Sequence, residues 1–222
     1  MIKKILNGTI AVWANSLIGI ILALILVPII LSSTGQEKYG LIVLVIFLSV
    51  RQGILGIFIF GVQSTVTKFV AEYHAKGESS KIGSLLSTAI LFYTVVSTSL
   101  VFILYSIKEW LFIEIFKIPN YIYLEFLNAV DYVFLSIFFQ FYSLIILGYL
   151  EGLHQFFRSK TIDTITYILY FISVIISLHY GYGYVEIIKF WALTHIITFI
   201  FLLIAFIFNK VIYFPSLIFR KK

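Results

Sequence analysis

Residues 41–62 read LIVLVIFLSVRQGILGIFIFGV, an apolar stretch that contains one charged residue, Arg51. About 20 consecutive apolar residues are enough for an α-helix to cross the hydrocarbon core of a bilayer. Five other stretches have the same character, and we predict six transmembrane helices at residues 10–31, 41–62, 82–105, 121–150, 162–178 and 185–208. Strands of a membrane β-barrel would be shorter, at roughly 10 residues, and would alternate in polarity. The sequence therefore predicts an all-α membrane protein, organised as a single six-span transmembrane lobe over residues 1–222.

The composition excludes a water-soluble domain. Hydrophobic residues make up 61% of the chain and charged residues 12%, and the mean hydropathy is +1.07, whereas a soluble domain is about one-quarter charged. The net charge of +6 therefore indicates an orientation in the membrane, and we expect no nucleic-acid partner. Because the chain has no cysteine, disulfides, thiolate metal sites and cysteine nucleophiles are excluded. We expect no metal and no cofactor.

The distribution of lysine and arginine predicts the orientation of the helices. If six helices alternate in direction, eleven cations fall on the side of both termini and four on the other side. The eleven are Lys3, Lys4, Lys68, Lys76, Lys81, Arg158, Lys160, Lys210, Arg220, Lys221 and Lys222, and the four are Lys38, Lys108, Lys117 and Lys189. Since positive loops stay in the cytoplasm, we predict that both termini are cytoplasmic. Cations near the surface would also attract anionic membrane lipids.

Three ionisable residues are predicted to lie near the middle of the bilayer. Arg51, Asp131 and His195 each fall about ten residues from the outer end of an even-numbered span, which is a depth of about 15 Å. Ionisable groups at this depth are costly and mark functional sites by default. A guanidinium can grip phosphate oxygens with two parallel hydrogen bonds, Asp131 could hold Arg51 or take up a proton or sodium ion, and His195 could titrate or hydrogen-bond a sugar. The alternative is a structural Arg51–Asp131 pair, with His195 as a packing residue.

Smaller polar residues extend this candidate cavity. Gln52 follows Arg51 directly, and Asn15 lies in the first span, so both are predicted to face the cavity. A hydrogen bond between helices explains Asn15 equally well. Gly53, Gly56 and Gly61 follow on the second span, where we favour close helix packing through small residues over a bendable helix.

Local motifs resemble a known family of transporters. The chain resembles the N-terminal part of the Wzx-like polysaccharide and oligosaccharide flippases, in the superfamily that includes the MATE drug/sodium antiporters. The most specific motif is the Gly-x-x-x-Tyr-Gly segment that follows a proline-bearing first helix. The matching segments are Pro28-Ile29-Ile30, Gly35-Gln36-Glu37-Lys38-Tyr39-Gly40, Phe60-Gly61-Val62-Gln63-Ser64-Thr65, Lys68-Phe69-Val70-Ala71-Glu72-Tyr73 and Gly148-Tyr149-Leu150-Glu151-Gly152-Leu153.

The resemblance implies a function that is not enzymatic. Such proteins move an undecaprenyl-diphosphate-linked sugar repeat across the bacterial cytoplasmic membrane by alternating access between two six-helix lobes. The chain has the length of the N-terminal lobe alone, and we expect a truncated or half-size member that needs a second lobe, from its own kind or another chain. Three alternatives stay open: a lobe of a drug or ion antiporter, a membrane enzyme, and a non-transporting partner of a polysaccharide export assembly. An enzyme is disfavoured because the four histidines are scattered and no loop carries paired acidic residues.

Overall fold

The computed structural model describes residues 2–208, with side chains from residue 6 onward. No strand occurs in this part of the chain, and the elements are helical throughout. In chain order they are α1 Ile2–Thr34, α2 Gln36–Phe47, the 3₁₀-helix η1 Ile54–Ile59, α3 Val62–Ala75, α4 Ser79–Trp110, the π-helical turn η2 Leu111–Ile115, α5 Asn120–Gly152, α6 Phe156–His179 and α7 Tyr184–Ile207. The predicted all-α class is thereby confirmed.

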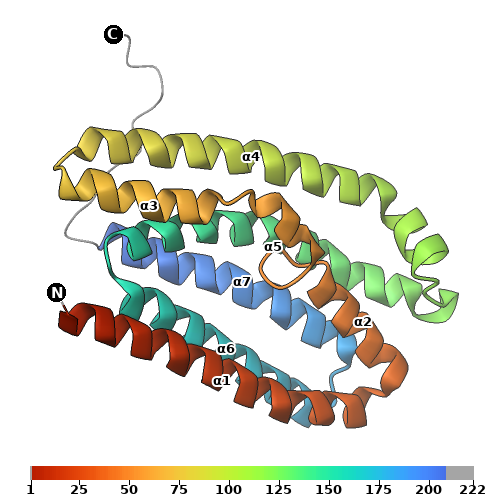
Figure 1. The fold of residues 1–222 in the computed structure, drawn as a ribbon. Helices are drawn as coiled ribbons and strands as arrows, with labels where there is room; N and C mark the ends of the chain where they lie inside the picture. Colours follow the sequence, from red (N-terminus) through yellow and green to blue (C-terminus); the bar gives the residue numbers. More distant parts are fainter. Residues whose placement is uncertain (1, 209–222) are drawn as a thin grey trace.

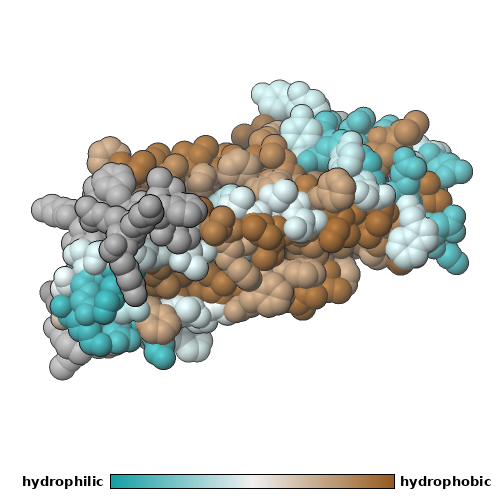
Figure 2. All heavy atoms as spheres, turned by 90° about the horizontal axis from the view of Figure 1, so that it is seen from above, coloured by the Kyte–Doolittle hydropathy of each residue, from teal (hydrophilic) through white to brown (hydrophobic). Residues whose placement is uncertain are grey.

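Six helical segments are long and apolar enough to cross a membrane. They span Leu6–Thr34, Ile54–Ala75, Ser79–Ile115, Asn120–Gly152, Phe156–His179 and Tyr184–Ile207. A brown apolar band covers the middle of the visible face and teal polar residues gather at its two ends (Figure 2). The chain is therefore a helical protein of the multi-pass membrane class, as predicted.

The second predicted span differs from the structure. Residues 41–62 do not form one continuous helix, because α2 ends at Phe47 and the next helical turns begin at Ile54. An added Cβ at Gly53 would lie 2.0 Å from the carbonyl oxygen of Phe47, so the chain folds back closely on the end of α2. A second turn follows at Phe60 and Gly61, whose φ angles of 50° and 69° lie in the left-handed region. The helical part of this region that is long and apolar enough to cross a membrane by itself runs from Ile54 to Ala75.

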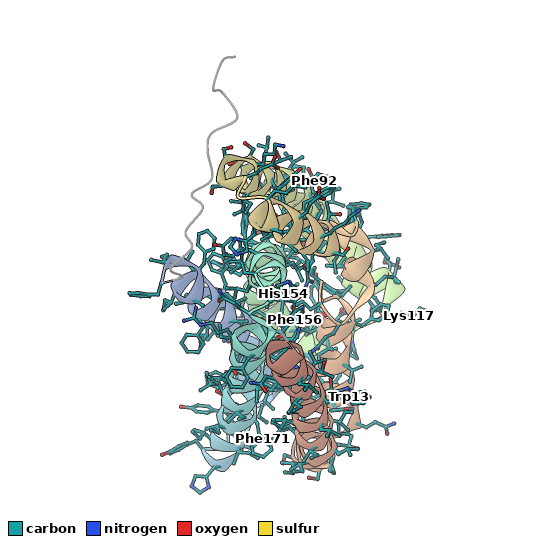
Figure 3. All side chains as sticks on the ribbon, turned by 60° about the vertical axis from the view of Figure 1, so that its left-hand side comes forward. Trp13, Phe92, Lys117, His154, Phe156 and Phe171 are labelled. Atoms are coloured by element: carbon teal, nitrogen blue, oxygen red, sulfur yellow. The ribbon has the colours of Figure 1, made fainter. Side chains whose placement is uncertain are left out.

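Helix α5 occupies the centre of the bundle. It contacts α3 and α4 on one side and α6 and α7 on the other, and α1 packs against α6 at the edge (Figure 1). Phe156, at the start of α6, lies beside α1 (Figure 3), where a Cβ added at Gly8 would come within 3.2 Å of its Cβ. The largest buried side chains on and around α5 are aromatic, among them Tyr93, Phe126, Phe141 and Tyr149.

The connections lie at alternate ends of the bundle (Figure 1). The turns at 76–78 and 153–155 lie at the end where α1 begins, and those at 35, 116–119 and 180–183 lie at the opposite end. The described side chains that count toward the charge bias are Lys68, Lys76, Lys81, Arg158 and Lys160 at the first end, and Lys38, Lys108, Lys117 and Lys189 at the second. The side chains of Lys3 and Lys4, together with Lys210, Arg220, Lys221 and Lys222, lie outside the described residues. The cytoplasmic position of both termini stays a prediction.

Candidate functional site

A cavity of about 210 Å³ lies between four helices. Helices α1, α2, α7 and α6 form a ring in which each contacts the next. One wall is aliphatic and comes mainly from α1 and α2. The opposite wall is polar and aromatic, and its members are Arg51, Gln52, Asp163, Thr166, Tyr167, Tyr170, Trp191, Thr194, His195 and Thr198.

Arg51 enters this cavity from the break in the second span. It forms a bidentate ion pair with Asp163 on α6, in which Nη1 and Nη2 each lie 3.1 Å from Oδ1 and Nη2 lies 3.2 Å from Oδ2. The Asp163 side chain is 3% exposed and the Arg51 side chain 20% exposed. The carboxylate is therefore buried behind the guanidinium, and part of the guanidinium stays accessible from the cavity.

The predicted partnership of Arg51 with Asp131 is wrong. Asp131 is half-exposed on α5 and pairs with Lys108 on α4, at 3.4 Å. Because Lys108 lies in the last turn of α4, Asp131 lies in the part of α5 that packs against the end of α4. It does not line the cavity.

Sequence reasoning missed Asp163 because the fifth span was predicted to begin at residue 162. The structure begins α6 at Phe156, so Asp163 lies two turns inside the helix. A signal was present in the sequence: Asp163 is followed by an apolar run with no further charge until Glu186. An acidic residue with such a neighbour is a candidate partner for a buried cation.

Of the other three predicted site residues, two line the cavity and one does not. Gln52 and His195 line the cavity, as expected. The His195 ring lies edge-on to Trp191 with ring centroids 4.5 Å apart, and its Nε2 atom is buried without a hydrogen-bond partner among the described residues. Asn15 does not line the cavity. Its Oδ1 accepts a hydrogen bond of 2.8 Å from the Thr164 hydroxyl, which is the helix–helix contact considered as the alternative.

A chain of polar side chains continues from Asp163 toward the end of the bundle. The Lys160 Nζ lies 3.9 Å from Asp163 Oδ2 and 3.0 Å from Glu151 Oε1. Gln63 Nε2 in turn donates to Glu151 Oε2 at 3.3 Å. The charges alternate along this chain, so Arg51 in the break and Lys160 on α6 neutralise the carboxylates of Asp163 and Glu151.

Arg51 is the one lysine or arginine in the described lining of the cavity. No group of three or more His, Cys, Asp or Glu side chains that could hold a metal ion occurs among residues 6–208. The Arg51 guanidinium provides parallel donors that match phosphate or carboxylate oxygens. Asp163 already occupies these donors, and an incoming anion would compete with it.

Comparisons with protein-family models, with curated proteins and with solved structures found no match. The likeness to flippases therefore depends on the sequence motifs alone. Of the most specific motif, Gly35 has a φ angle of 81° and forms the turn between α1 and α2, whereas Gly40 lies within α2. The structure by itself defines a helical membrane protein with a discontinuous second span and a cavity that contains the Arg51–Asp163 ion pair.

Proposed function

We propose that the chain is one lobe of a transporter that flips undecaprenyl-diphosphate-linked oligosaccharide repeat units across the bacterial cytoplasmic membrane. The observation that supports this proposal most directly is the guanidinium of Arg51, partly exposed in the wall of a cavity inside the membrane-crossing bundle. The diphosphate of a lipid carrier would replace Asp163 on the two guanidinium donors. The aliphatic wall from α1 and α2 would face the adjoining isoprenoid.

The exposed side of the break supports the need for a second lobe. Irregular backbone at membrane depth is tolerated where it is buried in protein or lines a water-filled cavity. Gln52 is exposed on this segment, and lipid is an unsuitable neighbour for its amide side chain. A second six-helix lobe, from a further copy or from another chain, would cover this side and enclose the cavity.

The proposed activity is transport, without a chemical step. An antiporter for cationic drugs would need an acidic cavity, whereas the one acidic side chain of the described lining, Asp163, is neutralised by Arg51. The competing proposal of a drug antiporter therefore has less support.

Direct binding tests the proposal. Trp191 lines the cavity, so its fluorescence, in a Trp13→Phe/Trp110→Phe background, reports titration with undecaprenyl diphosphate in nanodiscs. We expect Arg51→Lys to weaken binding and Arg51→Ala to weaken it by about 30-fold or more, as for the loss of about 2 kcal/mol from a buried charge pair. Glycan export in cells carrying these variants should fall in the same order.

Arg158→Ala is the matched control, because Arg158 is an exposed arginine of α6 that contacts Gln155 and lies outside the cavity. It should bind the carrier lipid as the unmodified chain does. Equal binding and equal export by all three variants would contradict the proposal.

A further inference from the structure

The break in the second span leaves backbone groups without helical partners. The N–H groups of Leu48 and Ser49 still donate to carbonyls of α2, and that of Gln52 donates to the Ser49 hydroxyl. Those of Val50 and Arg51 have no backbone carbonyl as acceptor among the described residues. Water does not satisfy such groups in the hydrocarbon region, where each one costs several kcal/mol. The N–H groups of Val50 and Arg51 nevertheless have an acceptor. It is the side-chain oxygen of Gln140, 3.1 Å from the nitrogen of Val50 and 3.4 Å from that of Arg51.

The amide of Gln140 is itself held in place on α5. Its side chain is fully enclosed, at 1% exposure of the residue. Its Nε2 donates to the hydroxyl of Ser136 at 3.1 Å, and that hydroxyl donates to the carbonyl of Val133 at 2.7 Å. The Nε2 atom of Gln140 thus bonds within α5, and its Oε1 atom points toward the break. Gln140 therefore takes the place of the missing helical carbonyl.

We propose that Gln140 is the positioning residue for Arg51. By accepting the peptide N–H groups at residues 50 and 51, it sets where the Arg51 backbone lies and hence where the guanidinium meets the cavity and Asp163. The identity of the anion that Arg51 binds rests on the proposed function, whereas the positioning role does not.

A residue that merely filled space at position 140 would act differently. Leucine has a similar volume and no acceptor, so Gln140→Leu preserves packing and removes the acceptor of the buried Val50 N–H and of the partly buried Arg51 N–H. Glutamate keeps a side-chain oxygen at the same distance from α5, and burial favours its protonated form, whose O–H can donate to Ser136 in place of Nε2. Gln140→Glu therefore preserves the acceptor. The pair of variants separates the hydrogen bonds from the volume.

The absence of cysteine from the chain allows a direct measurement. Arg51→Cys introduces the sole thiol, and its rate of labelling by a water-soluble maleimide is measured in nanodiscs. We expect Gln140→Leu to raise this rate about fivefold or more, because losing a buried hydrogen bond changes the population of an ordered segment by such a factor. Gln140→Glu should restore a rate near that of the Gln140 protein.

Two controls separate positioning from general loosening of the bundle. Tyr182→Cys places a thiol in the exposed turn between α6 and α7, and its labelling rate should not respond to Gln140→Leu. Ser143→Ala removes an equally buried polar group of α5 that bonds to the Phe139 carbonyl of its own helix, and it should not change labelling at position 51. An unchanged rate at position 51 in Gln140→Leu, or an equal rise in Ser143→Ala, would overturn the proposal.

Failure to fold and failure of the proposed function have distinct readouts. If Gln140→Leu is not monodisperse, Ser136→Ala removes the hydroxyl that holds the amide and should raise labelling at position 51 in the same direction by a smaller factor, whereas no rise would overturn the proposal. Titration of the Arg51-containing protein with undecaprenyl diphosphate is separate. If the labelling rate responds as expected but the protein does not bind this lipid, the positioning role of Gln140 stands and the proposed cargo is contradicted.

Discussion

At the scale of single residues, the central feature is a charge pair in which one member is buried and the other partly accessible. Removing one partner of a buried pair is costly, because the remaining charge has lost its compensation. Asp163 is enclosed, whereas Arg51 is partly open to the cavity. Removing Asp163 therefore leaves a partly exposed guanidinium, whereas removing Arg51 leaves a buried carboxylate. This asymmetry suits a guanidinium that exchanges its internal carboxylate for an incoming anion.

Asp163, the observed partner of Arg51, and Asp131, the predicted one, are expected to respond differently to substitution. Asp163→Asn should lower the free energy of unfolding by an amount near the low end of about 3–5 kcal/mol, because Arg51 loses its partner but retains some exposure. Asp131→Asn removes a half-exposed contact with Lys108 and should change it by about 1 kcal/mol or less. Thermal unfolding in detergent measures both. A larger effect for Asp131→Asn would contradict the assignment of Asp163 as the buried partner.

At the scale of elements, the second span is a helix divided in two by a tightly folded connection. Gly53, Gly56 and Gly61 were predicted to pack against other helices. In the structure the space beside Gly53 and Gly56 is filled by backbone of the same segment, since added Cβ atoms would lie 2.0 Å from the Phe47 oxygen and 3.0 Å from the Val50 oxygen. Tyr93 on α4 donates to the carbonyl of Ile59 at 2.9 Å, so side chains from outside the span satisfy its backbone.

The glycines of this region provide a matched pair of substitutions. Gly53→Ala should destabilise the protein by about 1–3 kcal/mol or more, because its Cβ overlaps the Phe47 carbonyl and forces the break to shift. Gly40→Ala lies within α2 with open space around it and should stabilise the helix by about 0.5–1 kcal/mol. Thermal unfolding of both variants is the measurement, and equal effects of the two would contradict the described break.

Close packing of α3 on α5 depends on a second pair of glycines. Cβ atoms added at Gly148 and Gly152 would lie 2.7 Å from the Gln63 carbonyl oxygen and 2.7 Å from the Val70 Cβ, respectively. The small residues four apart therefore serve contacts inside the bundle. We expect Gly152→Ala to lower the free energy of unfolding by about 1–3 kcal/mol, measured as above. Gly181 provides the control, because a side chain added in its open turn meets no neighbour. Its φ angle of 75° is one that asparagine tolerates, so the control variant is Gly181→Asn.

At the scale of the whole molecule, the described connections divide between the two ends of a bundle with an apolar middle (Figures 1 and 2). This arrangement agrees with alternating spans, and it makes the orientation a choice between two possibilities. The charge bias that favours cytoplasmic termini depends largely on cations near the two termini of the chain.

Reporter fusions distinguish the two orientations. An alkaline phosphatase fused after Gly181 should be active, because the α6–α7 turn is expected to face the exterior, and one fused after Gly77 should be inactive. The reason is the retention of positively charged loops in the cytoplasm. Activity at Gly77 and its absence at Gly181 would reverse the predicted orientation.

The sequence by itself determined that the chain is helical and apolar enough to cross a membrane six times, because span length and composition are local properties that the bilayer thickness selects. It also singled out Arg51, Gln52 and His195, which do line one cavity. The tertiary structure alone decided which carboxylate meets Arg51 and how the second span ends. Helix phase and relative depth set side-chain partners across 90 or more residues of chain, as for Arg51 with Asp163 and the break with Gln140, and such distances leave no periodic signal in the sequence.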